Sequence, residues 1–296
     1  MMQLPIVRGE YRLNYNLSHF SWFKTGGNAE VFFKPADLED LQFFLQNIDR
    51  KIPLYVLGNF SNVIIRDAGV KGVVIKLGRN FANIVSEEGV LKVGAATLNS
   101  SLVQYSLVNS YGGFEFLAGI PGCVGGGIRM NAGCYGHEFK DIILEVKAID
   151  FMGNIQHFKM SEDLFGYREC FLPKNLIFIE GIFKTGSKPS AEIKSKIEEI
   201  TNLRLKSQPI KELTSGSTFA NPLPYKAWEM IDSVGLRGFT IGGAKFSELH
   251  CNFLINTGTA TSKDLEDLGE LAVKKVLEEK NIQLRWEIQR IGELCV

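Results

Sequence analysis

The sequence of 296 residues lacks a net charge, because its 33 lysines and arginines balance 33 aspartates and glutamates. A neutral chain sets up no overall field that would attract a polyanion, so neither nucleic acid nor a membrane surface is expected as a partner. The sequence also lacks any run approaching the roughly 18 apolar residues of a transmembrane helix. Residues 1–16 lack the long apolar core of a signal peptide. These absences predict a soluble, cytoplasmic protein that holds any anionic ligand through local groups.

Cysteine and histidine are too few and too widely spaced to predict a metal site. No two of the five cysteines form a C-x-x-C pair or a zinc-ligand spacing, and their odd number favours reduced, intracellular thiols. The cysteines are Cys123, Cys134, Cys170, Cys251 and Cys295. The histidines, none at a metal-like spacing, are His19, His137, His157 and His250.

Proline is scarce, with 9 residues against 30 glycines, which is typical of a compact protein with many tight loops. Residues 37–48 place their apolar side chains on one helical face, with Asp37 as the N-cap. Short β-branched runs follow at 54–57, 63–65 and 72–77. The N-terminal part therefore reads as a small α/β unit.

The pattern changes after residue 89. We predict a strand at 90–95, a helix at 97–110, a glycine-dense loop at 111–136, and strands within 143–159 and at 177–184. In the 143–159 segment, Leu144, Val146 and Ala148 are expected on one face, with Glu145 and Lys147 on the other and a turn at Gly153-Asn154. Such antiparallel signals favour an α+β fold over a uniform parallel βαβ wind.

The charged, helical segment 190–204 marks a boundary. Beyond it we expect a polar loop at 206–222, a helix near 225–234, a strand around 252–256, a helix at 262–280 that buries Leu265, Leu268, Ala272 and Val276, and a strand at 283–292. The chain is therefore expected to divide into residues 1–80, 81–200 and 201–296.

Two glycine-rich segments are suited to bind an anion through backbone amides. The first is 58–62, which follows a predicted strand, and the second runs from Gly119 to Gly133. Glycine lets N–H groups converge on a pyrophosphate without a Cβ in the way. Neither is a standard dinucleotide fingerprint, because the first leads into the strand-like 63–65 rather than a helix, and no P-loop motif is present. Tight turns without a ligand remain the alternative for both.

Three polar positions could carry chemistry. Arg168 lies in an otherwise apolar segment, Ser217 lies in a turn of small residues, and Glu287 lies in a strand beside a tryptophan. Each also has a structural alternative. Arg168 could form a buried ion pair, Ser217 could serve a turn or cap a helix, and Glu287 could be a solvent-facing strand residue.

These positions lie within seven segments that occur in the same order in a known family. The segments are FKTGGNAEVFFKP (23–35), VLGNFSNVIIRD (56–67), FEFLAGIPGCVGGGIRMNAGCYG (114–136), GYREC (166–170), QPIKELTSGSTFANP (208–222), GLRGFTIGGAKFSELHCNFLIN (235–256) and WEIQRIG (286–292). The sequence resembles the UDP-N-acetylenolpyruvoylglucosamine reductases of peptidoglycan synthesis, which share the vanillyl-alcohol-oxidase FAD-binding fold. It is similar to the shorter class, which lacks an extra substrate loop.

The resemblance implies two FAD-binding α/β subdomains at 1–80 and 81–200 and a substrate-binding α/β domain at 201–296, with the C-terminal strand able to return to the FAD-binding part. It implies that NADPH reduces FAD, which then passes hydride to the enolpyruvyl double bond of a UDP-sugar. By the same resemblance, Arg168 and Glu287 stabilise the enolate-like intermediate and Ser217 donates the proton. A monomer or weak dimer is expected.

The implied ligand contacts are more numerous. Cofactor binding is expected at Gly58, Asn59, Phe60, Ser61, Asn62, Gly119, Ile120, Pro121, Gly122, Gly125, Asn131 and Gly133. Substrate binding is expected at Tyr167, Asn221, Lys206 and Gln208, the last three because they flank Ser217.

The residue types suit this chemistry. A guanidinium stabilises enolate charge, and one such preorganised contact can contribute about 3 kcal/mol. A carboxylate helps only when protonated or bridged, so the pKa of Glu287 is expected to rise in the complex. A serine hydroxyl is a weak acid but faces a strongly basic carbanion, so its position matters more than its pKa.

The chain departs from the family pattern near these positions. Phe60 replaces a glycine, Cys170 a serine, Ala220 a lysine, Trp286 a proline and Gln289 an arginine. Two alternatives stay open: an oxidase of the same fold that uses oxygen, and a nucleotide-binding module without catalysis.

Overall fold

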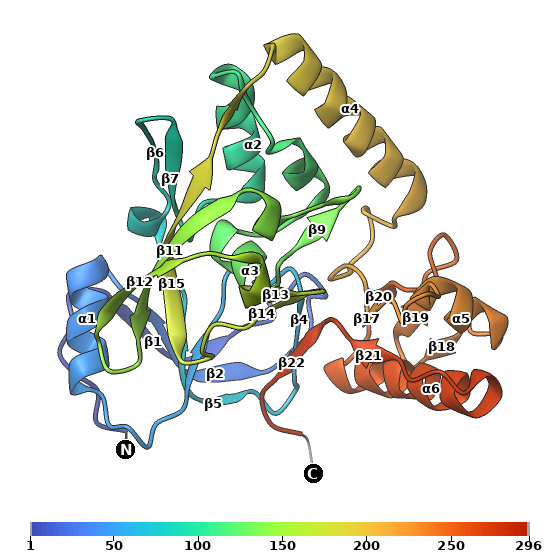
Figure 1. The fold of residues 1–296 in the computed structure, drawn as a ribbon. Coiled ribbons are helices and arrows are strands. Elements are labelled where there is room, and N and C mark those ends of the chain that lie inside the picture. The colour runs from blue at the N-terminus through green and yellow to red at the C-terminus, as the bar shows by residue number, and fades with distance from the viewer. Residues whose placement is uncertain (1, 295–296) are drawn as a thin grey trace. The chain divides into compact units, whose positions relative to one another are not determined.

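The computed structural model describes residues 2–294 (Figure 1). Contacts between Cα atoms group the chain into two compact units, each made of three segments. The first unit contains the chain up to Arg12, Phe32–Asn59 and Val73–Asn202. The second contains Leu13–Val31, Phe60–Gly72 and the chain from Leu203 onward. The predicted boundaries near residues 80 and 200 stay predictions.

The first unit is built on a five-stranded sheet of order β12-β11-β15-β7-β6 (Figure 1). The strands are β6 (Ile84–Glu87), β7 (Val90–Gly94), β11 (Ile143–Asp150), β12 (Ile155–Lys159) and β15 (Leu176–Lys184). Every neighbouring pair is antiparallel, as the alternation of residues 143–159 predicts. The hairpin between β11 and β12 turns at Gly153, whose φ of 86° suits glycine.

The prediction of which side chains share a face of β11 is wrong at the start of the strand. Leu144 was expected to share the face of Val146 and Ala148, but its side chain is 41% exposed while Ile143 is buried. The register of β11 with β15 shifts between Ile143 and Glu145, as in a β-bulge. An extra residue reverses the alternation on one side of the bulge, which the sequence pattern does not reveal.

Helices and aromatic rings fill the core of this unit. Helix α2 (Asn99–Val108), the short helix α3 (Val124–Arg129) and the first part of α4 (Ser190–Ser207) belong to it. The ring of Phe183 packs edge-on against Phe114 and Phe139, with centroids 6.1 Å apart in each case. Burying one such ring stabilises the fold by about 1.5–3 kcal/mol. Residues 111–136 are thus not a pure loop, because α3 forms within them.

A second sheet, of order β1-β2-β5-β3, includes strands with residues in both units. Its strands are β1 (Glu10–Asn16), β2 (Asn28–Lys34), β3 (Leu54–Val56) and β5 (Val70–Ile75). Within the first unit, β3 pairs parallel with β5 from Leu54–Val73 to Val56–Ile75. Helix α1 (Leu38–Asn47) begins at the predicted cap, since Asp37 accepts a hydrogen bond from the amide of Asp40.

The remaining strands of the first unit are short antiparallel pairs. They are β8 (Tyr111–Gly112) with β16 (Gly186–Ser187), β9 (Gly133–Cys134) with β10 (His137–Glu138), and β13 (Phe165–Gly166) with β14 (Glu169–Cys170).

The second unit contains the long helix α6 (Ser262–Lys280) and the shorter α5 (Ala227–Ser233). Its strands are β4 (Val63–Ile65), β17 (Phe219–Ala220), β18 (Thr240–Ile241), β19 (Ala244–Phe246), β20 (Leu254–Asn256), β21 (Arg285–Trp286) and β22 (Gln289–Ile291). The C-terminal strand β22 pairs parallel with β4, and β17 pairs antiparallel with β21.

The start of α6 is fixed from two sides. Thr261 and Asp264 form a capping box, and the carboxylate of Asp67 accepts hydrogen bonds from the amides of Ser262 and Lys263 at 3.0 and 2.9 Å. The helix buries Leu265, Leu268, Ala272 and Val276 as predicted. No helix within residues 2–294 is both long and apolar enough to cross a membrane.

Candidate active site

Two of the predicted catalytic residues, Ser217 and Glu287, are brought together in the second unit by backbone pairing. Phe219 of β17 lies opposite Trp286 of β21. The amide of Glu287 donates to the carbonyl oxygen of Thr218 at 2.8 Å. Glu287 therefore takes part in this pairing and Ser217 directly precedes it at Thr218, although the two residues are far apart in the sequence.

The segment that carries Ser217 is held by buried polar contacts on its other side. The amide of Thr218 donates to the carbonyl of Asn252 at 2.7 Å, and the Thr218 hydroxyl accepts from the amide of Leu254 at 3.2 Å. Thr218 is fully buried, whereas Ser217 is only partly buried. Since adjacent side chains in extended chain point to opposite sides, anchoring Thr218 in the core directs the Ser217 hydroxyl away from it.

Asn62, predicted to bind the cofactor, forms hydrogen bonds with the backbone of the segment that carries Glu287. Its side-chain amide donates to the carbonyl of Glu287 at 3.1 Å, and its own carbonyl accepts from the amide of Gln289 at 3.0 Å. One residue of the first glycine-rich segment thus fixes the backbone on either side of Ile288, directly after Glu287. This role has no signal in the sequence, because the partners are far apart along the chain.

Phe60, which replaces a family glycine, keeps a backbone conformation that favours glycine. Its φ is 56°, in the left-handed region. The ring is almost fully buried and stacks on Phe20, with centroids 5.3 Å apart and planes 19° from parallel. The substitution therefore keeps the turn and adds an aromatic contact beneath it.

Arg168, the third predicted catalytic residue, lies in the first unit in the tight turn between β13 and β14. Its φ is 61°, a strained conformation for a side-chain-bearing residue. The guanidinium donates from Nη2 to the carbonyl of Gly133 at 2.7 Å, lies 3.7 Å from Glu138 Oε1, and lies 5.0 Å from the ring centre of Tyr167. Backbone strain that persists beside a fixed guanidinium is typical of functional positions.

The glycines of the two loops allow close packing in the first unit. A Cβ on Gly58 would lie 2.5 Å from Cys123 Sγ, and one on Gly119 would lie 2.8 Å from Cys134 Sγ. A Cβ on Gly125 would lie 2.9 Å from the Cβ of Ala95. Gly58 and the second loop therefore adjoin at a separation that only glycine permits.

A buried acceptor without a partner marks the second loop as a place for a ligand. Asn99 donates from Nδ2 to the carbonyl of Ile120 at 3.1 Å, and its amide donates to the carbonyl of Gly122. Its Oδ1 is buried and accepts no hydrogen bond from the described residues. A buried acceptor normally has a donor, so this atom fits a bound cofactor with N–H or O–H groups. Nothing in the sequence marks Asn99 as a ligand-binding residue, because it lies inside the predicted helix 97–110.

Lys76 is a second residue suited to an anionic ligand that the sequence pattern did not single out. It follows β5 in the first unit, and burial lowers the pKa of its ammonium, with the charge of Lys34 adding to the effect. A half-buried cation is suited to an anionic ligand.

Asn131 has a structural role that was not foreseen. Its side chain is fully buried, donates to Glu138 Oε2 and the carbonyl of Gly166 at 3.0 Å each, and accepts from the amide of Lys140 at 3.0 Å. The side chain therefore braces the loop beside Arg168. Gly133, also predicted to bind the cofactor, supplies the carbonyl that Arg168 contacts.

The predicted substrate residues are more scattered. Asn221 accepts a hydrogen bond from the amide of Ala227 at 3.0 Å and so caps α5. Gln208 accepts from Arg204 Nε at 3.2 Å, Lys206 is exposed near the end of α4, and Tyr167 is exposed beside Arg168. Just before Ser217, the buried hydroxyls of Thr214 and Ser215 have no partner among the described residues.

The described cysteines are mostly buried, and the expectation of reduced thiols stays a prediction. Among the described residues, Cys123, Cys134, Cys170 and Cys251 form no disulfide. Burial raises the pKa of the Cys170 thiol and raises that of Cys251 to about 11. Cys295 lies outside the described residues.

Comparison with known proteins confirms the fold class and the resemblance. A model of an FAD binding domain matches residues 29–159, and a model of the UDP-N-acetylenolpyruvoylglucosamine reductase C-terminal domain matches residues 208–291. The UDP-N-acetylenolpyruvoylglucosamine reductase of Rickettsia massiliae (strain Mtu5) is 56% identical over 292 residues, covering 99% of each chain. That of Rickettsia bellii (strain RML369-C) is 54% identical over 294 residues, covering 99% of this chain and 97% of the relative.

A solved structure agrees with these relatives. The UDP-N-acetylenolpyruvylglucosamine reductase of Thermus caldophilus superposes with a TM-score of 0.83 at 33% identity, covering 97% of this chain and 100% of that one. The predicted α+β class, with an FAD-binding part followed by a C-terminal part, is thereby confirmed. The chain belongs to the UDP-N-acetylenolpyruvoylglucosamine reductase family.

Proposed function

We propose that this chain reduces UDP-N-acetylglucosamine enolpyruvate to UDP-N-acetylmuramate, with FAD as bound cofactor and NADPH as reductant, in peptidoglycan synthesis. The observation that carries the proposal is the backbone hydrogen bond from the amide of Glu287 to the carbonyl of Thr218, the residue that directly follows Ser217. The relatives that match the whole chain carry the name of this activity.

FAD, when bound, accepts hydride from NADPH and supplies hydride to the enolpyruvyl double bond. The residues proposed to hold it are those of segments 58–62 and 119–125 with Asn131 and Gly133, to which we add Asn99. Asn99 is included because its buried Oδ1 accepts no hydrogen bond from a described residue. The packing of Gly58 against Cys123 suits a cradle built from backbone amides.

Ser217 is proposed to donate a proton to the carbon next to the one that receives hydride. The double bond thus gains one hydride and one proton, and the serine recovers its proton from solvent. Position is expected to matter most, because an alcohol is a weak acid that works here only against a strongly basic carbon. The burial of Thr218 supports this role, because it fixes the direction in which the Ser217 hydroxyl points.

Arg168 and Glu287 are proposed to stabilise the negative charge that develops towards the substrate carboxylate. A fixed guanidinium needs no reorganisation when that charge forms, and the contact of Arg168 with Gly133 supports such fixation. Tyr167, Asn221, Lys206 and Gln208 remain proposed substrate contacts. The Oδ1 of Asn221 accepts from the amide of Ala227 at the start of α5, so we propose that Asn221 contacts the substrate through other atoms.

The setting of the enzyme is also a proposal. A cytoplasmic location suits a chain in which no helix of the described part could span a membrane and whose cofactors are soluble. We further propose that the chain acts as a monomer or weak dimer, and that residues 1–80, 81–200 and 201–296 are its FAD-binding subdomains and substrate-binding domain.

The test is NADPH oxidation by the purified flavoprotein without oxygen, measured with and without UDP-N-acetylglucosamine enolpyruvate. Oxidation of many equivalents per flavin that requires this acceptor is the expected result. Oxidation that stops after one equivalent in both cases would remove the substrate assignment and leave the flavoprotein fold. Turnover restored by oxygen alone would instead favour an oxidase, and a protein that binds no FAD would favour a non-catalytic module.

A further inference from the structure

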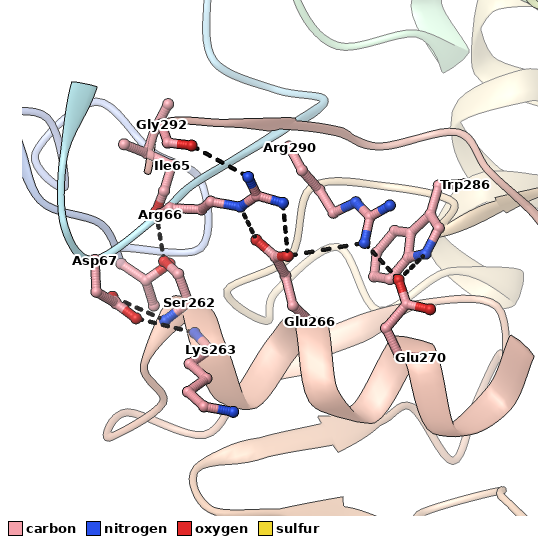
Figure 2. Close-up of polar contacts among 11 residues, drawn as sticks. Ile65, Arg66, Asp67, Ser262, Lys263, Glu266, Glu270, Trp286, Arg290 and Gly292 are labelled. Carbon is pink, nitrogen blue, oxygen red and sulfur yellow. Dashed lines mark hydrogen bonds and ion pairs between the residues drawn. The ribbon is translucent and has the colours of Figure 1, made fainter. Parts of the chain in front are cut away.

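The indole of Trp286 is seated on α6 of the second unit, directly before Glu287 (Figure 2). A Cβ added to Gly269 of α6 would lie 2.2 Å from Cη2 of this ring, a distance that real Cβ atoms do not reach. The indole Nε1 donates to Glu270 Oε1 at 3.0 Å. The benzo edge of the ring therefore approaches α6 at Gly269, more closely than a side chain there would allow.

A network of charged side chains lies beside the indole ring (Figure 2). The guanidinium carbon of Arg290 lies 4.4 Å from the ring centre, and its Nη1 lies 2.5 Å from Glu270 Oε1 and 3.7 Å from Glu266 Oε2. Arg66 binds both oxygens of Glu266, at 2.8 and 3.2 Å. Two arginines and two glutamates thus alternate beside α6, so that each charged group lies next to one of opposite sign.

The indole also contacts the strand that follows Ser217. The ring centres of Trp286 and Phe219 are 5.0 Å apart, and these two residues are direct partners in the β17–β21 pair. Trp286 consequently contacts α6 and β17 at once. Glu287 comes next in the chain, with its amide on Thr218 and its carbonyl on Asn62.

We propose that Trp286 is a positioning residue for Glu287: its indole, seated over Gly269 and bonded to Glu270, fixes the side of β21 from which the Glu287 carboxyl projects. Neighbouring residues of a strand point to opposite sides, so a ring held on α6 directs the next side chain away from the helix. The proposal rests on the proposed function, because it gives Glu287 a role in reduction of the acceptor.

A methyl group on Gly269 meets the indole whether Trp286 positions Glu287 or only fills the core, so the two readings differ in which reaction step is slowed and not in the clash itself. Alanine normally favours a helix interior over glycine, so Gly269→Ala would stabilise α6 if nothing opposed the new methyl group. With the indole in place, the methyl group instead displaces the ring and, with it, the strand that carries Glu287.

The experiment measures two rates in single-turnover reactions of the FAD-loaded enzyme: flavin reduction by NADPH, and reoxidation of the reduced flavin by UDP-N-acetylglucosamine enolpyruvate. We expect Gly269→Ala to slow the second rate on the order of ten-fold or more, since a displacement of about 1 Å can cost far more. The first rate is expected to stay within about two-fold, because hydride transfer from NADPH does not use Glu287.

Three further comparisons separate positioning from loss of stability. Lys274→Gly, on the exposed side of α6, weakens the helix without reaching the indole and is expected to change neither rate. Trp286→Leu should slow the acceptor step, and adding Gly269→Ala to it should then have no further effect, since both changes act through one contact. Trp286→Phe loses both the Glu270 hydrogen bond and the benzo edge that meets Gly269, so it should also slow the acceptor step and leave flavin reduction unchanged, which tests the proposal even if Gly269→Ala fails to fold.

The outcomes are distinct. An acceptor step unchanged in Trp286→Leu, or slowed independently by the two substitutions, overturns the positioning role. Equal slowing of both rates by Gly269→Ala overturns it as well. Glu287→Gln and Ser217→Ala serve as references, because an acceptor step unchanged in those two would refute the proposed function rather than this inference.

Discussion

The side-chain amide of Asn252 satisfies both backbone polar groups of Phe219. Its Nδ2 donates to the Phe219 carbonyl at 2.8 Å, and its Oδ1 accepts from the Phe219 amide at 2.9 Å. Both residues are buried, Asn252 with 3% of its surface exposed. A side chain thus takes the place of a neighbouring strand for the chain that follows Ser217.

Removal of this amide should destabilise the second unit. Asn252→Ala leaves two buried backbone groups without partners, and each such group costs about 1–3 kcal/mol, so we expect a loss of about 2 kcal/mol or more in the free energy of unfolding. Urea denaturation of the variant measures it. Asn47→Ala removes an exposed amide that bonds only within α1 and serves as the control. Equal denaturation midpoints for the two variants would show that the hydrogen bonds between Asn252 and Phe219 do not stabilise the second unit.

The parts of the fold that follow a local rule were predictable. The buried stripe of α6 repeats at helical spacing, and Asp37 caps α1 as its residue type suggests. The bulge at Leu144 and the helix α3 were not, because tertiary contacts decide them. A Cβ on Gly127 of α3 would lie 2.2 Å from the ring of Phe139, so this glycine serves helix packing rather than a loop.

The residues of the candidate site also fall into those that could be predicted from the sequence and those that could not. Ser217, Glu287 and Arg168 were singled out by residue type and resemblance, and the first two do lie beside one backbone pairing. The residues that hold them could not be found in the sequence. Asn62 reaches Glu287 over 225 positions and Asn252 reaches Phe219 over 33, and neither contact leaves a periodic or compositional trace.

Ser217 is expected to act in only one half of the reaction. Ser217→Ala should leave flavin reduction by NADPH intact and slow reduction of the enolpyruvyl acceptor by about 10²–10⁴-fold, the usual contribution of a positioned proton donor. Rapid-mixing measurements of flavin absorbance separate the two steps. Ser207→Ala, which removes an exposed hydroxyl at the end of α4, is the matched control. Equal losses in both steps would refute the proton-donor role.

The strained turn at Phe60 predicts an unusual order of stabilities. Phe60→Ala removes the buried ring at a cost of about 3–5 kcal/mol but keeps a side chain at a φ of 56°. Phe60→Gly loses the same ring yet relieves the backbone, which is worth about 1–2 kcal/mol. We therefore expect stability to decrease from wild type to Phe60→Gly to Phe60→Ala, in urea denaturation with FAD bound. An alanine variant at least as stable as the glycine variant would show that the turn carries no strain.

His250 predicts how the stability of the second unit depends on pH. Burial, with a smaller effect of Arg237, lowers the pKa of this imidazole below its ordinary value. Its Nδ1 also accepts a hydrogen bond from the amide of Asn252 at 3.3 Å, which requires that nitrogen to be unprotonated. The folded protein therefore binds a proton at His250 less readily than the unfolded chain does.

The sign of the effect follows from this difference in proton binding. Above the unfolded pKa of about 6.5, both states are neutral at His250 and its contribution is fully present. As the pH falls below that value, the unfolded chain gains a proton first, so stability is lost until the folded pKa is passed. Melting temperatures measured between about pH 5 and pH 8 should fall more steeply for the wild type than for His250→Gln. His157→Gln, at an exposed histidine paired with Glu145, is the comparison for a general charge effect, and parallel curves for wild type and His250→Gln would exclude His250 as the cause.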